Sequence, residues 1–202
     1  MFLTNHAQLI KRLPSWLYKL GAQSYIDWNY PRHLFIETTA KCNLVCSYCP
    51  REQLDDHMDF QLFKQIVDEA SSYGPRSFSL HLFGEPLLYP QLFDAVRYIK
   101  SADSGHTILL TTNGTLLNRY VDELVQSGVT RVFWTWRTEA RFRPETKAKL
   151  KEWGRFCVRF INEITTEEAK KEWGDWPLKE SRQMHDYGGN IDLSKWNVQP
   201  VE

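Results

Sequence analysis

The sequence predicts an α/β fold built on a parallel sheet, and three observations indicate it. Apolar, β-branched segments of strand length alternate with segments whose apolar residues recur at helical spacing, five times and with a weak sixth strand signal. Such alternation is typical of parallel strands joined by helical crossovers. Turn residues separate the segments, and no internal repeat or low-complexity run divides the 202 residues, a length that suits one domain.

The expected strands are the apolar and β-branched runs of the chain. HLFIETT at 33–39 is the first, and SFSLHLF at 77–83 alternates as a half-buried strand does. TILLTT at 107–112 stops at Asn113-Gly114, a dipeptide typical of turns. The remaining expected strands cover residues 129–136 and 155–161, with the poorly marked sixth at 182–185.

The expected helices are the segments in which apolar residues return every three or four positions. They cover residues 58–71, 90–101, 119–127, 144–153 and 166–173. Gly74-Pro75 follows the first and Gly128 ends the third, because glycine and proline break regular structure. Thr165 or Thr166 is expected to cap the last helix.

The charge balance does not suggest a nucleic-acid or membrane partner. Lys plus Arg and Asp plus Glu are 25 each, so the formal net charge is zero. No apolar run reaches the roughly 18 residues of a membrane span. Residues 1–32 are expected to form an amphipathic helical segment rather than a signal peptide, because charges such as Lys11 interrupt it. We expect a cytoplasmic protein with a core domain at 33–192 and a tail at 193–202.

Several polar segments fall just past the ends of expected strands. They are the cysteine-rich segment after residue 39, Gly84-Glu85-Pro86, Asn113-Gly114 and Arg137. Ligands of parallel sheets bind at the carboxyl ends of the strands. The convergence of these segments on one rim therefore predicts a binding site there.

Three of the four cysteines lie within eight residues, as Cys42, Cys46 and Cys49 in a C-x3-C-x2-C pattern. Close spacing in a chain of this kind favours metal binding over disulfides. Three thiolates can hold one cubane iron–sulfur cluster and leave its fourth iron open to a small molecule. Cys157 lies inside an apolar strand and is expected to be a buried core residue.

Two other interpretations of the cysteines remain open. A zinc site would need a fourth ligand from His57, Cys157 or His185, each far along the chain. A non-catalytic iron–sulfur protein for electron transfer or redox sensing would need a fourth protein ligand as well.

Three segments resemble motifs of the radical S-adenosylmethionine (radical SAM) superfamily. TTAKCNLVCSYCP at 38–50 resembles its cluster loop, HLFGEPLL at 81–88 its Gly-Glu-Pro motif, and TTNGTLL at 111–117 its third-strand signature. They occur in the family order, and the resemblance covers about residues 35–164. The chain resembles the core domain of SPASM-type peptide-modifying members, without their auxiliary-cluster extension. The resemblance implies a single compact domain with a partial parallel (β/α)6-type barrel.

The resemblance also implies the roles of individual residues. A [4Fe–4S] cluster would be bound by Cys42, Cys46 and Cys49, and its open iron would take S-adenosylmethionine. Tyr48 matches the aromatic residue near the adenine, and Asn113 is expected on the cofactor side of the site.

For the remaining motif residues, alternatives stay open. Gly84, Glu85 and Pro86 match the segment that binds the methionine amino group, although such residues also form plain strand-to-helix turns. The fourth strand departs from the family pattern. Thr135 is expected near the ribose. Arg137, or else Arg141 or Arg143, is expected to pair with the carboxylate of S-adenosylmethionine.

The implied function is reductive cleavage of S-adenosylmethionine to a 5′-deoxyadenosyl radical, which abstracts hydrogen from a peptide or small-molecule substrate. A flavodoxin or ferredoxin-type reductant would supply the electron. His185 and Asp186 are weak candidates for proton chemistry, the alternative being a glycine-rich loop. We expect the tail from Trp173 onward to close the open end of the barrel, with His185 and Tyr187 facing the cavity; the alternative is a mobile tail.

Overall fold

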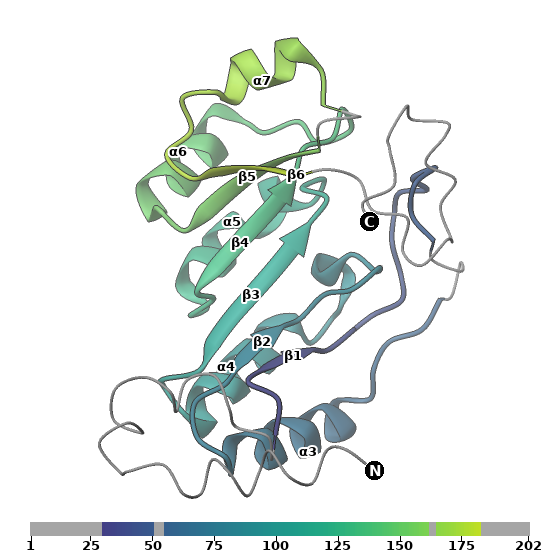
Figure 1. Cartoon of the computed structure of the whole chain (residues 1–202), viewed down its shortest axis with the longest axis vertical. Helices are drawn as coiled ribbons and strands as arrows, with labels where there is room; N and C mark the ends of the chain where they lie inside the picture. Colours follow the sequence, from purple (N-terminus) through teal and green to yellow (C-terminus); the bar gives the residue numbers. More distant parts are fainter. Residues whose placement is uncertain (1–29, 51–54, 162–164, 183–202) are drawn as a thin grey trace, which may run out of the picture.

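The computed structural model describes residues 30–50, 55–161 and 165–182, and they form one six-stranded sheet with helices (Figure 1). The strands follow the order β1-β2-β3-β4-β5-β6, and each pairs in parallel with the next. The predicted α/β fold with a parallel six-stranded sheet is therefore confirmed.

Sheet and helices alternate along the chain as predicted. The strands are β1 (His33–Phe35), β2 (Ser77–Ser79), β3 (Thr107–Thr112), β4 (Arg131–Thr135), β5 (Phe156–Ile161) and β6 (Lys179–Arg182). The helices are α3 (Phe60–Ser71), the 3₁₀ helix η2 (Pro86–Leu88), α4 (Leu92–Ala102), α5 (Leu117–Gln126), α6 (Pro144–Trp153) and α7 (Glu167–Trp173).

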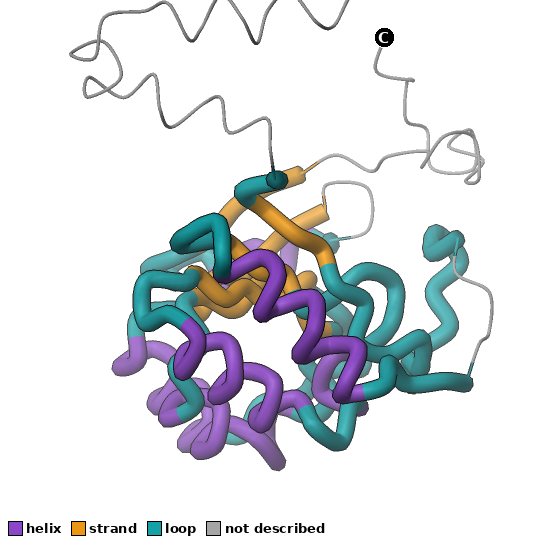
Figure 2. The backbone as a smooth tube through the Cα atoms, turned by 90° about the horizontal axis from the view of Figure 1, so that it is seen from below, coloured by secondary structure: helices purple, strands orange, loops and turns teal. Residues whose placement is uncertain are grey.

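The helices cover one face of the sheet, and strand alternation divides core from cavity (Figure 2). Phe78, Leu110, Trp134 and Val158, one from each central strand, are buried in a single hydrophobic core. Their strand neighbours point to the opposite face, because successive side chains of a strand alternate. Polar residues can therefore gather on that face without disturbing the core.

The first two strands are shorter than predicted, and a side chain explains the end of β2. The backbone N–H of Thr111 in β3 donates to Nδ1 of His81 at 3.0 Å. The imidazole of His81 thus accepts the hydrogen bond that a backbone carbonyl of β2 would accept if the strand continued. β2 accordingly ends at Ser79 although the alternating sequence continues to residue 83.

The sixth strand exists but was predicted at the wrong position. It begins at Lys179 rather than residue 182, and its sequence KESR has no apolar alternation. Backbone pairing with β5 and an ion pair between Glu180 and Arg159 hold it instead. Neither contact can be recognised from the local sequence.

The prediction that the tail from Trp173 closes the barrel is wrong for its first aromatic residues. Trp173 is buried in the core, with its ring 4.7 Å from that of Trp134. Trp176 packs on Trp173 and donates its Nε1–H to the carbonyl of Phe156 at 2.8 Å. Neither residue lines the cavity at the strand ends. The rest of the tail, with His185, Asp186 and Tyr187, lies outside the described residues.

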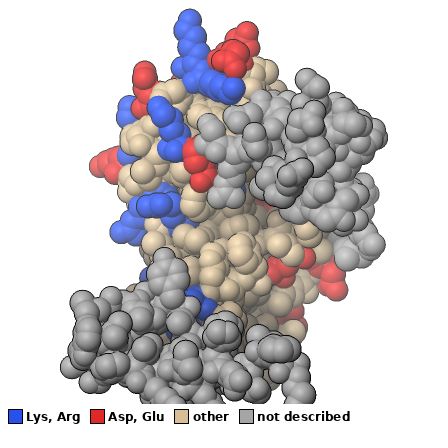
Figure 3. All heavy atoms as spheres, viewed as in Figure 1, with Lys and Arg blue, Asp and Glu red and all other residues tan. Residues whose placement is uncertain are grey.

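The surface agrees with the balanced composition. On the face shown in Figure 3, basic and acidic side chains are interspersed, with no large area of one sign. Among the described residues, no helix has both the length and the apolar character needed to cross a membrane.

Candidate functional site

A cavity of about 360 Å³ opens at the carboxyl ends of the strands, where the sequence predicted a site. Nine of the ten predicted metal and cofactor residues line it, and Pro86 does not. The nine are Cys42, Cys46, Tyr48, Cys49, Gly84, Glu85, Asn113, Thr135 and Arg137. The predicted convergence is thus present, whereas the ligand roles of these residues stay predictions.

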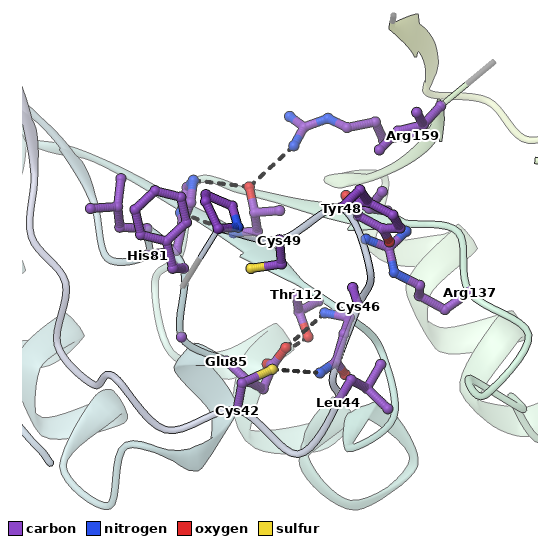
Figure 4. A pocket seen from close by; sticks show the side chains of 18 of the residues that line it. Cys42, Leu44, Cys46, Tyr48, Cys49, His81, Glu85, Thr112, Arg137 and Arg159 are labelled. Atoms are coloured by element: carbon purple, nitrogen blue, oxygen red, sulfur yellow. Dashed lines mark hydrogen bonds between the residues drawn. The ribbon is translucent and has the colours of Figure 1, made fainter. Parts of the chain in front are cut away.

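The three cysteines lie on one loop after β1, spaced along the rim of the cavity (Figure 4). Each is half-buried, and the N–H of Cys49 donates to the carbonyl of Cys46 at 3.0 Å, which curls the loop. Among the described residues, no three Cys, His, Asp or Glu side chains converge on a point that suits a single metal ion. A zinc site draws its thiolates to about 2.3 Å from one ion, whereas a cubane binds each on a different iron. Which of the two the cysteine loop holds stays a prediction.

Gly84 lets the Gly-Glu-Pro segment dock on the cysteine loop. A Cβ at this position would lie 1.8 Å from the carbonyl oxygen of Thr39, so no side chain fits there. The N–H of Glu85 donates to the carbonyl of Lys41 at 2.8 Å, immediately before Cys42. The segment is therefore a backbone contact to the cysteine loop and not only a turn.

Glu37 holds the same segment from the other side, and sequence reasoning missed it. Its carboxylate accepts from the N–H groups of Phe83 at 2.9 Å and Gly84 at 3.1 Å. The partners lie 46 and 47 residues apart in the chain, so no local pattern indicates the contact.

Glu85 is almost fully buried and binds the end of β3. Its carboxylate accepts from Thr112 Oγ1 and from the N–H of Asn113, both at 2.7 Å, and from the N–H of Leu87 at 3.1 Å. Burial raises the pKa of Glu85 to about 7, and the three accepted hydrogen bonds limit the rise. Glu85 therefore braces the rim of β3 against the cysteine loop.

The side chain of Asn113 bridges the third strand and the cysteine loop. Its Nδ2 donates to Oδ1 of Asn43 at 2.9 Å and to Sγ of Cys42 at 3.8 Å. Its Oδ1 accepts from the N–H and Oγ1 of Thr115. The contact to Cys42 joins the third predicted motif to the first.

On the opposite rim, an arginine stacks on the aromatic residue of the cysteine loop. The guanidinium carbon of Arg137 lies 5.0 Å from the ring centre of Tyr48, a cation–π arrangement. Burial raises the pKa of Tyr48, so its hydroxyl stays neutral at physiological pH. Of the three candidate arginines, Arg137 lines the cavity, whereas Arg141 and Arg143 are exposed and do not.

A polar wall below the rim was not predicted. Nε2 of His81 lies 2.9 Å from Oγ1 of Thr111, and Arg159 donates to the same oxygen at 3.4 Å. Burial, with a smaller contribution from the charge of Arg159, lowers the pKa of His81 to about 4, so the imidazole is neutral. Arg159 pairs in turn with Glu180.

Strand register is the signal that would have found this wall. Thr135 in β4 is aligned with Arg159 in β5, which is aligned with Glu180 in β6. Neighbours in register point to the same face, so Arg159 faces the same cavity as Thr135. The sequence pattern of β5 indicates only an apolar strand, and Arg159 was therefore not predicted as a cavity residue.

The other histidine and cysteine candidates lie elsewhere. Nδ1 of His57 is 2.8 Å from Oγ1 of Thr39, and His57 does not line the cavity. Cys157 is buried in β5, as predicted for a core residue. Two of the three proposed fourth ligands for zinc are thus away from the site, and His185 lies outside the described residues.

Known proteins are similar in sequence to the part of the chain that carries the three motifs. The sequence pattern of the Radical SAM superfamily matches residues 36–134. The chain is 34% identical over 110 residues to a tungsten-containing aldehyde ferredoxin oxidoreductase cofactor-modifying protein of Pyrococcus furiosus, a match covering 52% of this chain and 30% of that protein. It is 34% identical over 97 residues to a GTP 3′,8-cyclase of Chlorobaculum tepidum, covering 46% and 29%. The chain therefore spans less than a third of either relative.

A solved structure extends the likeness of the fold. Streptococcus suis SuiB bound to the precursor peptide SuiA superposes with a TM-score of 0.64 at 19% identity, over 96% of this chain and 50% of that one. The order of the motifs, their convergence on one cavity of this chain and the matched pattern agree. The chain belongs to the radical SAM superfamily.

Proposed function

We propose that the chain uses a [4Fe–4S] cluster on Cys42, Cys46 and Cys49 to cleave S-adenosylmethionine reductively. The radical SAM superfamily uses this cluster and this cosubstrate, and structures with the same fold contain bound S-adenosylmethionine. When bound, the pair supplies a 5′-deoxyadenosyl radical that abstracts hydrogen from a substrate. The observation that carries the proposal is the backbone docking of Gly84-Glu85 beside the three thiols.

The residues around the thiols fit a cluster with one open iron. In the described lining, the one further imidazole or thiol is that of His81. Both ring nitrogens of His81 bond to Thr111, so neither is directed at the cysteine loop. This arrangement supports a catalytic cluster over a closed electron-transfer cluster, which would need a fourth protein ligand.

The chain's own groups then bind and orient the cosubstrate. Arg137 supplies a cation on the rim facing Tyr48, where a carboxylate gains a charge-assisted hydrogen bond. Thr135, which lines the cavity at the end of β4, supplies a hydroxyl for a ribose. Gly84-Glu85 presents backbone groups next to the cysteine loop for the amino group.

We propose that the substrate is a peptide or a small molecule and that it contacts the wall of the cavity below the rim. The cavity is lined there by the polar side chains of Thr111 and Arg159, and also by the exposed apolar side chains of Phe35 and Leu82. Apolar lining with a few converging polar groups is typical of ligand sites. A flavodoxin or ferredoxin-type protein is proposed as the electron donor.

Anaerobic reconstitution tests the proposal. The protein should bind about four iron and four sulfide ions, as one cubane requires, and release 5′-deoxyadenosine when dithionite and S-adenosylmethionine are added. Replacing any one of the three loop cysteines by alanine should abolish both, because the cluster loses a ligand. Cys157→Ala is the matched control and should retain both. Stoichiometric zinc without iron would refute the proposal.

A further inference from the structure

The amide of Asn113 contacts a thiol that the proposed cluster would use. Its Nδ2 lies 3.8 Å from Sγ of Cys42, within hydrogen-bonding reach of sulfur, and 2.9 Å from Oδ1 of Asn43. An amide NH₂ has two donors, and these contacts use one each. Figure 4 shows the dashed line that ends on the sulfur of Cys42.

The orientation of this amide is determined by its neighbours. Oδ1 of Asn113 accepts from the backbone N–H of Thr115 at 3.0 Å and from its hydroxyl at 2.7 Å. A flipped amide would turn its NH₂ toward the N–H of Thr115 and its oxygen toward Oδ1 of Asn43 and the sulfur of Cys42. The contacts with the backbone N–H of Thr115 and with Oδ1 of Asn43 would then pair like with like, so the network favours the orientation in which the N–H faces the sulfur.

The backbone of Asn113 is held as firmly as its side chain. Its N–H donates to Glu85 at 2.7 Å, and its carbonyl accepts from Nε1 of the buried Trp134 at 3.1 Å. Nδ2 of Asn43 donates to Oγ1 of Thr115 at 2.8 Å, which closes a ring of three side chains. The donor is thus pre-positioned before any cluster is bound.

We propose that Asn113 is a positioning residue that sets the reduction potential of the cluster through its hydrogen bond to Cys42. This inference rests on the proposed function. Hydrogen bonds to cluster sulfurs are among the factors that set such potentials. The reduced cluster carries one more negative charge, so a donor to its thiolate stabilises the reduced form more than the oxidised form. The hydrogen bond therefore raises the potential and makes reduction easier.

Asn113→Ala and Asn113→Asp test the proposal through the midpoint potential, measured by redox titration followed by electron paramagnetic resonance without S-adenosylmethionine. Asn113→Ala removes the donor, and its potential should fall by an amount equal to about a tenfold change in the oxidised-to-reduced ratio, or about 59 mV for one electron. Asn113→Asp keeps the acceptor for Thr115 but places a negative charge beside the sulfur, so its potential should fall further.

Asn118→Ala is the matched control. Asn118 is the second residue of α5, and its amide bonds to the backbone of Arg141 and Arg143. Its potential should equal that of the wild type. An unchanged potential in fully loaded Asn113→Ala and Asn113→Asp would overturn the proposal.

Thr115→Ala covers the case in which the Asn113 variants fail to load iron. It removes the hydroxyl that orients the amide and touches no cysteine in the contacts described, so it should lower the potential by a smaller amount. An unchanged potential there would also overturn the proposal. If the wild-type protein itself binds no cluster, the proposed function fails instead.

Discussion

The two sides of the cavity are built by different means. The side formed by β1 to β3 is joined by backbone and short side-chain contacts, such as Gly84 against Thr39 and Glu85 on Asn113. The side formed by β4 to β6 depends on two long cationic side chains, Arg137 stacked on Tyr48 and Arg159 paired with Glu180. The Radical SAM pattern matches residues 36–134, so it includes β2 and β3 and ends within β4, before Thr135, Arg137 and Arg159 of the second side.

This difference indicates a division of labour. Backbone contacts leave little freedom, because an added atom meets a carbonyl rather than a movable side chain. Long side chains can be exchanged without moving the strands that carry them. We therefore expect changes on the first side to disturb the cysteine loop, and changes on the second side to leave it intact.

Gly84→Ala should have the largest effect on stability. Its Cβ would lie 1.8 Å from the carbonyl oxygen of Thr39, so the two loops must separate. We expect a loss of about 3 kcal/mol or more in the free energy of unfolding, from overpacking against backbone. Urea denaturation of the apo-protein measures it.

Gly74→Ala is the control for this substitution. Gly74 has a φ of 84° but no atom within 4 Å of the added Cβ, so only backbone strain of about 1 kcal/mol is expected. Equal losses in the two variants would show that Gly84 is an ordinary turn residue.

Glu85 should make stability depend on pH. Its pKa is raised from 4.5 to about 7 on folding, so the folded state holds the proton more tightly. The contribution of Glu85 to the free energy of unfolding is fully present below pH 4.5 and is lost as the pH rises to about 7. The loss is at most about 3 kcal/mol. The lowered pKa of His81 gives a slope of opposite sign, since that group binds its proton more weakly when folded.

The comparison with Glu85→Gln isolates this effect. The amide of this variant cannot ionise, so subtracting the variant's pH–stability curve from that of the wild type removes the contribution of His81. The free energy of unfolding of the wild type minus that of the variant should be largest below pH 4.5 and should fall as the pH rises to about 7. A difference that is constant with pH would contradict the assignment.

Arg159→Met should have a smaller effect on stability than Gly84→Ala and none on the cluster. It leaves the partly buried Glu180 without the ion pair, which should cost about 2 kcal/mol because solvent still screens that carboxylate. Iron content after reconstitution should match the wild type. Loss of iron would show that the two sides of the cavity are not independent.

The sequence predicted much of the fold and the members of the site, but not its internal contacts. β3 has the predicted bounds because its residues alternate and a turn dipeptide follows it, and α6 has them because Pro144 begins it and Gly154 ends it. β6 was misplaced because its pairing, and the ion pair of Glu180 with Arg159, join residues 21 positions apart. Motif spacing located the three cysteines and Gly84-Glu85. The contact of Glu37 with the Gly-Glu-Pro segment could not be predicted, because it depends on which loops meet in the fold.

The central claim is that one iron of the cluster is open to S-adenosylmethionine. The wild-type protein, loaded with about four iron ions and reduced with dithionite, should give an electron paramagnetic resonance spectrum that changes in shape when S-adenosylmethionine is added. The change is expected because the cosubstrate binds an iron that Cys42, Cys46 and Cys49 leave without a protein ligand. Identical spectra with and without S-adenosylmethionine, from a fully loaded protein, would contradict the claim.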